Sequence, residues 1–104
     1  MCLSRSTKVS IETLSINPDF YVGRRLEVSG IKIKPQGRIT VFQAPEDMLS
    51  CYINLFCLYN GKNKILLGIR EGKAINLTTT EFGEFIFHGK WKYEGNIYFL
   101  LLRE

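Results

Sequence analysis

The side chains in this sequence that could do chemistry are mostly basic, and several lie close together. Ammonium and guanidinium groups that share one strand and its turn can neutralise phosphates, and binding of that kind weakens as salt rises. The same pattern is typical of a solvated strand face, whose charges oppose edge-to-edge aggregation. A single acid, Glu27, falls among the five cations of this stretch, which are Arg24, Arg25, Lys32, Lys34 and Arg38.

Aromatic side chains form a second candidate group in residues 50–59, SCYINLFCLY. This stretch is apolar at odd and even positions alike, so a strand here would be apolar on both faces. Tyr52 and Phe56 share the even face, with Asn54 between them. Such rings stack on nucleobases for about 1–3 kcal/mol per base, and exposed aromatics are equally typical of protein interfaces. The pattern predicts either a stacking platform or a docking surface.

Residues 85–93, FIFHGKWKY, predict a strand whose two faces differ. Large rings at alternate positions fill the interior of small β-barrels, so we expect Phe85, Phe87 and Trp91 in the core. Lys90 and Lys92 fall on the other face beside His88 and would extend a basic groove. The full set predicted to bind nucleic acid is Arg24, Arg25, Lys32, Lys34, Arg38, Tyr52, Phe56, Lys90, Lys92 and Tyr93.

Catalysis has little support in the sequence, which contains two aspartates, one histidine and no nucleophile motif. We therefore expect no enzyme activity, no metal and no cofactor. A thiolate of Cys51 or Cys57 activated by His88 is conceivable, but structural cysteine is favoured. Six residues of extended chain separate the two thiols, too far for a disulfide. Together with Cys2 they predict free buried thiols in a reducing compartment.

The length of 104 residues predicts one domain over 1–104, with 1–20 as an N-terminal lead-in. A net charge of +4 moderately favours anionic partners. The N-terminus lacks an apolar run of signal-peptide length, and IYFLLL near the end is too short to span a bilayer. These features predict a cytoplasmic or nuclear protein without a membrane partner.

The stretch Arg24 to Lys34, RRLEVSGIKIK, predicts a strand that changes faces. Leu26 and Val28 occupy even positions, whereas Ile31 and Ile33 occupy odd ones. One extra residue must be absorbed if both pairs point inward, and a bulge at Ser29-Gly30 would do so. A strand of this kind begins in one sheet and finishes in another.

The remaining elements are predicted from turn signals and alternation. After the Asn60-Gly61 hairpin signal, residues 64–72, KILLGIREG, could form a short connecting helix or a strand. Gly68 costs a helix about 1 kcal/mol relative to Ala, so the strand is favoured. Residues 9–16 are ambiguous between a short helix and a first strand, because their apolar positions fit either period poorly. The other expected elements are a turn at Pro35-Gln36-Gly37 leading into a hairpin strand at 38–42, a strand at 50–59, a short strand at 73–78, a strand at 85–93, a turn at 94–96 and a last strand at 97–102.

An antiparallel chain with a glycine-containing bulged first strand and a final hairpin carrying Gly89-Lys90-Trp91 resembles the OB-fold, a small five-stranded barrel. The segment NPDFYVGRRLEVSG resembles the lead into the first strand of small members, and the likeness covers residues 17–58 and 82–102. It implies an all-β antiparallel barrel that binds on the face of strands two and three, between loops at Lys34 to Arg38 and Tyr93 to Asn96. A meander barrel of six to eight strands is the alternative.

Three functions are compatible with this reading. The first is a non-enzymatic OB-like module that binds single-stranded nucleic acid through a basic, aromatic face. The second is a protein-interaction subunit in a hetero- or homo-oligomer, similar to the small OB subunits of replication protein A-like and telomere-capping complexes. The third is a barrel around a small apolar ligand, against which the bulky inward side chains Phe85, Phe87 and Trp91 argue.

Overall fold

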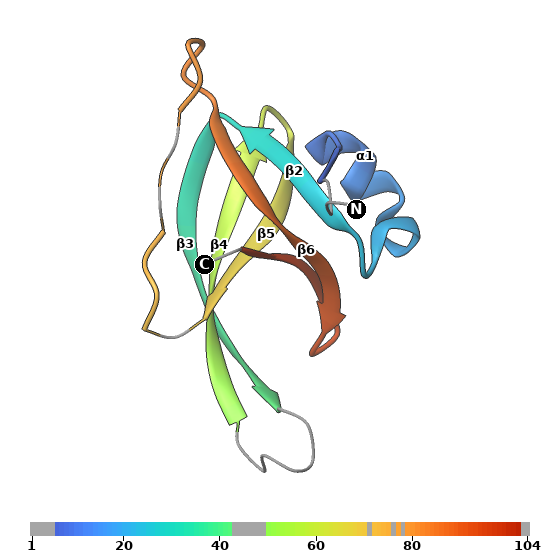
Figure 1. Cartoon of the computed structure of the whole chain (residues 1–104), viewed down its shortest axis with the longest axis vertical. Coiled ribbons are helices and arrows are strands. Elements are labelled where there is room, and N and C mark those ends of the chain that lie inside the picture. Colours follow the sequence, from blue (N-terminus) through green and yellow to red (C-terminus); the bar gives the residue numbers. More distant parts are fainter. Residues whose placement is uncertain (1–5, 43–49, 71, 76, 78, 103–104) are drawn as a thin grey trace, which may run out of the picture.

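A computed structural model of the chain describes residues 6–42, 50–70, 72–75, 77 and 79–102. Within these ranges the protein is mostly β, as expected, with seven strands in one twisted sheet that does not close (Figure 1). The strands are β1 (Thr7–Lys8), β2 (Arg25–Gly30), β3 (Lys32–Phe42), β4 (Ser50–Asn60), β5 (Asn63–Arg70), β6 (Phe85–Glu94) and β7 (Ile97–Leu102).

The strand order is β1-β2-β6-β7-β5-β4-β3, so neighbours in the sheet are not always neighbours in sequence. The meander alternative is therefore wrong, because β6 and β7 stand between β2 and β5. Most pairs are antiparallel, but β1 pairs with β2 and β5 pairs with β7 in parallel. The expected purely antiparallel arrangement needs this correction.

The stretch from Arg24 to Lys34 is divided at Ile31 into the end of β2 and the start of β3. β2 pairs with β6, whereas β3 pairs with β4. The chain thus changes partners as predicted, but within one sheet and through a corner without a bulge. Ile31 is 54% exposed and does not point inward as predicted, although its N–H donates to the Tyr59 carbonyl at 2.8 Å. Gly30 permits this approach, because a Cβ there would lie 2.6 Å from Leu58 Cγ.

The register shift lies instead between Pro35 and Gly37, where we predicted a turn. β3 runs through this point and pairs with β4 along its whole length, so the predicted hairpin between 24–34 and 38–42 is wrong. Proline has no N–H for a ladder and is tolerated at bulges and sheet edges, and β3 is the last strand in the order. Gln36 is the extra residue. Because directly opposed residues share a face, Lys34 opposite Cys57 and Arg38 opposite Asn54 point to opposite faces.

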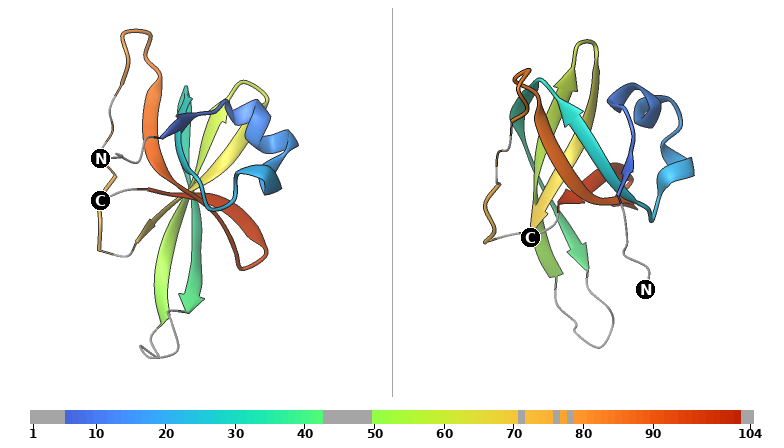
Figure 2. Two further views of the ribbon diagram at one scale, coloured as in Figure 1. Left: turned by 45° about the vertical axis from the view of Figure 1, so that its right-hand side comes forward. Right: turned by 45° about the horizontal axis from the view of Figure 1, so that its top comes forward.

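The undecided segment 9–16 contains a helix, α1 (Ile11–Ile16), followed by the 3-10 helix η1 (Pro18–Tyr21). Ser10 caps α1, since its Oγ accepts a hydrogen bond from the Thr13 N–H at 3.1 Å. Figure 2 shows α1 and η1 together on one side of the sheet. The strands predicted at 50–59, 85–93 and 97–102 are confirmed, and the one predicted at 64–72 is confirmed over 64–70. Residues 73–75 and 77 of the predicted strand at 73–78 form no strand.

Hydrophobic side chains gather on both faces of the sheet. On the first, here called the core face, Leu58, Leu67 and Leu100 pack with α1. Phe87 and Trp91 are buried there and Phe85 is partly buried against them, as expected. The opposite side, the second face, carries a smaller cluster of Ile53, Leu55 and Phe99. No helix in the described part of the chain is long and apolar enough to span a membrane.

Candidate nucleic-acid interface

Three side chains form a row across the second face of β3, β4 and β5. Lys32 is directly opposite Tyr59, and Tyr59 is directly opposite Lys64. The Lys32 Nζ lies 6.0 Å from the centroid of the Tyr59 ring, and the Lys64 Nζ lies 5.9 Å from it. Both distances are near the limit for cation–π attraction. This Lys–Tyr–Lys row therefore presents one half-buried ring with an ammonium on each side.

Lys34 adds a third ammonium to this face, two residues beyond Lys32 along β3 and opposite Cys57. Hydrogen bonding and charge repulsion from the Lys34 side chain lower the pKa of Lys32. The sequences of β3, β4 and β5 contain no aspartate or glutamate. The positive charge of the row is therefore not balanced by a carboxylate on its own strands, and an anion bound beside Lys32 and Lys34 would relieve their repulsion.

Arg38 and Tyr52 form a separate pair on the core face of β3 and β4. The Arg38 guanidinium carbon lies 4.7 Å from the centroid of the Tyr52 ring, which is 42% exposed. Phe56 shares this face but packs against the core cluster. It also lines a pocket of about 380 Å³ with Ile33 and Asn54. The predicted platform of Tyr52 and Phe56 therefore consists of one exposed ring and one that is partly buried against the core.

The other predicted cations lie on β2 and β6, or, for Arg24, just before β2. Arg25 and Lys90 are directly opposite each other. The Lys92 Nζ pairs with Glu94 Oε1 at 3.0 Å. The Arg24 guanidinium lies 4.6 Å from the Phe20 ring centroid. Since β7 lies between β6 and β5, the nearest strand of the row, these cations and the row do not lie on neighbouring strands.

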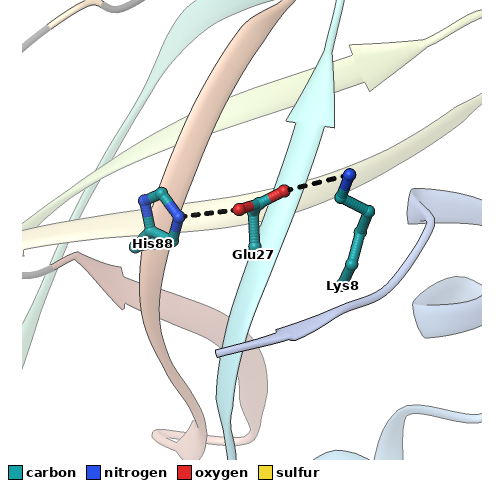
Figure 3. A network of polar contacts seen from close by, with 3 residues as sticks. All are labelled: Lys8, Glu27 and His88. Carbon is teal, nitrogen blue, oxygen red and sulfur yellow. Dashed lines mark hydrogen bonds and ion pairs between the residues drawn. The ribbon is translucent and has the colours of Figure 1, made fainter. Parts of the chain in front are cut away.

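Glu27 on β2 places a negative charge among the cations of β2 and β6 (Figure 3). Its carboxylate contacts His88 Nε2 at 2.9 Å and Lys8 Nζ at 3.6 Å.

Cys57 is buried, in no disulfide, and donates through Sγ to Gln36 Oε1 at 3.2 Å. His88 and Cys57 thus have different partners, and the conceivable Cys–His pair is not assembled. Cys2 and the side chain of Cys51 lie outside the described part. No group of three or more His, Cys, Asp or Glu side chains in the described ranges could hold a metal ion.

A pocket of about 390 Å³ opens beside the row, between the N-terminal helices and the sheet. Lys64 belongs both to the row and to the pocket wall, and Gln36, Cys57, Trp91 and Tyr98 also line the pocket. Trp91 Nε1 donates to the Pro18 carbonyl at 3.0 Å, which attaches η1 to β6.

The Tyr93 side chain reaches the pocket region through a stack of rings. Its ring centroid lies 4.6 Å from that of Tyr98, which stacks on Trp91 at 6.1 Å. Tyr93 is 49% exposed. The β6–β7 turn that it precedes, one of the two predicted binding loops, is confirmed as a turn, with Gly95 and Asn96 at positive φ. The other predicted loop, Lys34 to Arg38, is part of β3.

No protein family, curated protein or solved structure matches this chain. The function of the row must therefore be inferred from its own chemistry.

Sequence reasoning missed Tyr59, Lys64 and Gln36. Two signals could have found the first two. Alternation along 50–59 places Tyr59 beside Cys57, and a two-residue turn after Asn60 would pair Tyr59 with Lys64. No local signal distinguished a bulge at Gln36 from a turn, because proline and glycine favour both.

The Tyr98 hydroxyl predicts a pH dependence of stability. It donates to Asp19 Oδ1, and this hydrogen bond, with burial and the nearby charge, raises the pKa of Tyr98 from 10.0 to about 12. A pKa raised by folding stabilises the folded state below the unfolded value, so this contribution is complete below pH 10 and is lost between pH 10 and 12. Urea unfolding across this range should show the wild type losing its stability advantage over Tyr98→Phe. An advantage that stays constant to pH 12 would contradict the hydrogen bond.

Proposed function

We propose that this chain is a non-enzymatic, OB-like module that binds single-stranded nucleic acid on the second face of β3, β4 and β5. The observation that carries the proposal is the Lys–Tyr–Lys row, an aromatic ring between two ammonium groups on strands without carboxylates. A base can stack on Tyr59 while phosphates on either side approach Lys32 and Lys64. Stacking needs an exposed base face, which single strands offer and duplexes hide.

The strand pairing supports the OB-like part of the proposal. If β2 and β3 count as one bent first strand, it is shared between β6 and β4, and the remaining strands are β4, β5, β6 and β7. Strands two and three then correspond to β4 and β5, the face on which OB-folds bind oligonucleotides. Tyr59 and Lys64 lie on those two strands. The loop between strands one and two would be 43–49, outside the described residues.

The two alternative functions have weaker support. A docking surface built on Tyr52 and Phe56 would have little free aromatic area, because Phe56 is partly buried against the core cluster and Arg38 contacts the Tyr52 ring. An enclosed apolar ligand would need room in a core that Phe87, Trp91 and Leu100 fill. Both stay predictions.

The test of the row is Tyr59→Leu. We expect it to weaken binding of a fluorescein-labelled single-stranded oligonucleotide by about 5- to 150-fold, the equivalent of about 1–3 kcal/mol for one stacked base. The measurement is fluorescence anisotropy at 50 mM salt. Tyr59→Phe keeps the ring and serves as the matched control, with affinity expected near that of the wild type.

The charge contribution can be separated with two double variants of equal net charge. Lys32→Gln with Lys64→Gln should flatten the plot of log affinity against log salt by about 1.4, at about 0.7 per phosphate lost on a single strand. Arg25→Gln with Lys90→Gln removes two charges from β2 and β6, outside the row, and should leave the slope unchanged. Equal effects from both double variants would contradict the row as the binding site, and no binding at all would overturn the function.

A further inference from the structure

The pocket beside the Lys–Tyr–Lys row has the features of a site for one planar, polar group. Its volume of about 390 Å³ lies near the lower end of the range for small-ligand sites. Tyr98 contributes a half-buried ring, which stacks on the buried Trp91, and Gln36 and Lys64 contribute polar groups. The wall thus combines a ring and the hydrogen-bonding groups that recognise a nucleobase.

The polar groups of the pocket favour a ligand that accepts hydrogen bonds. Gln36 Oε1 already accepts from Cys57 Sγ at 3.2 Å. The amide hydrogens of Gln36 are the donors that it can still offer, and the Lys64 ammonium only donates. The carbonyl oxygens of thymine, uracil, guanine and cytosine are acceptors of this kind. The bulge at Pro35/Gly37 matters here, because it adds Gln36 on the strand that also carries Lys32 and Lys34.

The pocket is also continuous with the row. Lys64 contributes to both, and Cys57 in the pocket wall lies directly opposite Lys34. A nucleotide next to the one stacked on Tyr59 would therefore lie at the pocket, with its phosphate near Lys64. We infer that the pocket receives one carbonyl-bearing base of the bound single strand. This inference rests on the proposed function and identifies a second base site within it.

The tryptophan gives a direct readout, because Trp91 is the only tryptophan in the chain and lines the pocket. We expect an unlabelled oligothymidylate to change Trp91 fluorescence in a saturable way. We expect an oligonucleotide with abasic sites along its whole length, which retains sugars and phosphates, to leave the fluorescence unchanged at the same concentrations.

Two variants test the location of the base. Ser15→Phe adds a ring at the pocket wall and should weaken oligothymidylate binding by about 5- to 150-fold and remove the fluorescence change. Gln36→Leu keeps the approximate size and removes the donors, with an expected loss of about 2- to 10-fold. Glu12→Phe is the matched control, because Glu12 is exposed on the same helix and is not part of the pocket wall.

The outcomes separate the pocket from the function it rests on. Anisotropy binding that depends on Tyr59, with no change in Trp91 fluorescence and no effect of Ser15→Phe, would overturn the pocket and leave the proposed function in place. Equal weakening by Ser15→Phe and Glu12→Phe would also overturn it, because the effect would then not belong to the pocket. No binding of any single strand at 50 mM salt would overturn both proposals.

Discussion

Replacing Trp91 with alanine should lower the free energy of unfolding by about 3–5 kcal/mol, the range for removing a large aromatic side chain from a core. Trp91 is 2% exposed on β6 and packs in the core cluster with α1. Its loss leaves a cavity and also removes the Nε1–H that holds the Pro18 carbonyl. A domain of ordinary stability has about 5–15 kcal/mol in total, so the variant should lose between about a fifth and all of its stability.

Trp91→Phe tests the same contribution to the free energy of unfolding if the alanine variant does not fold. Phenylalanine refills most of the cavity but cannot donate to Pro18, so we expect a smaller loss of about 1–2 kcal/mol. Urea unfolding followed by far-ultraviolet circular dichroism is the appropriate measurement, because the variants lack the fluorescent indole. A loss below about 1 kcal/mol for Trp91→Ala would contradict its place in the core.

Gly30→Ala should be the second most damaging change, with a loss of about 2–3 kcal/mol or more. A Cβ at this position would lie 2.6 Å from Leu58 Cγ and 2.7 Å from the Tyr59 carbonyl oxygen. Leu58 is fully buried, and the Tyr59 carbonyl accepts the Ile31 N–H at the corner. Neither neighbour can move without disturbing the core or the hydrogen bond between β4 and the corner.

The control for this prediction is the preceding residue. Ser29 is half-buried on β2, and Ser29→Ala should change the free energy of unfolding by no more than about 0.5 kcal/mol. Urea unfolding of the two variants under the same conditions makes the comparison. If Gly30→Ala and Ser29→Ala both lower the free energy of unfolding by a similarly small amount, the close contact of Gly30 with Leu58 and Tyr59 would be contradicted.

The corner also connects the fold to the candidate site. Tyr59 accepts the Ile31 N–H through its backbone and carries the ring of the Lys–Tyr–Lys row through its side chain. The Arg24–Lys34 alternation correctly predicted that the chain changes partners near Gly30. Leu26 and Val28 on even positions and Ile33 on an odd one do contact the same core cluster, so the alternation is offset at the corner around Ile31 and not by a bulge at Ser29-Gly30. The register shift at Pro35/Gly37 is a second offset, further along β3.

Alternation and turn residues determined the main strands and the hairpin after Asn60, because side-chain period and glycine conformation act over a few residues. With the strand bounds of the structure, the sequences of β3, β4 and β5 contain cations and no acid. Only the tertiary structure decided that Lys32, Tyr59 and Lys64 form one row, while Arg38, Arg25 and Lys90 lie elsewhere. The reason is that a row across a sheet depends on which distant strands pair and in which register. One extra residue at Gln36 reverses the face of every side chain that follows it in β3.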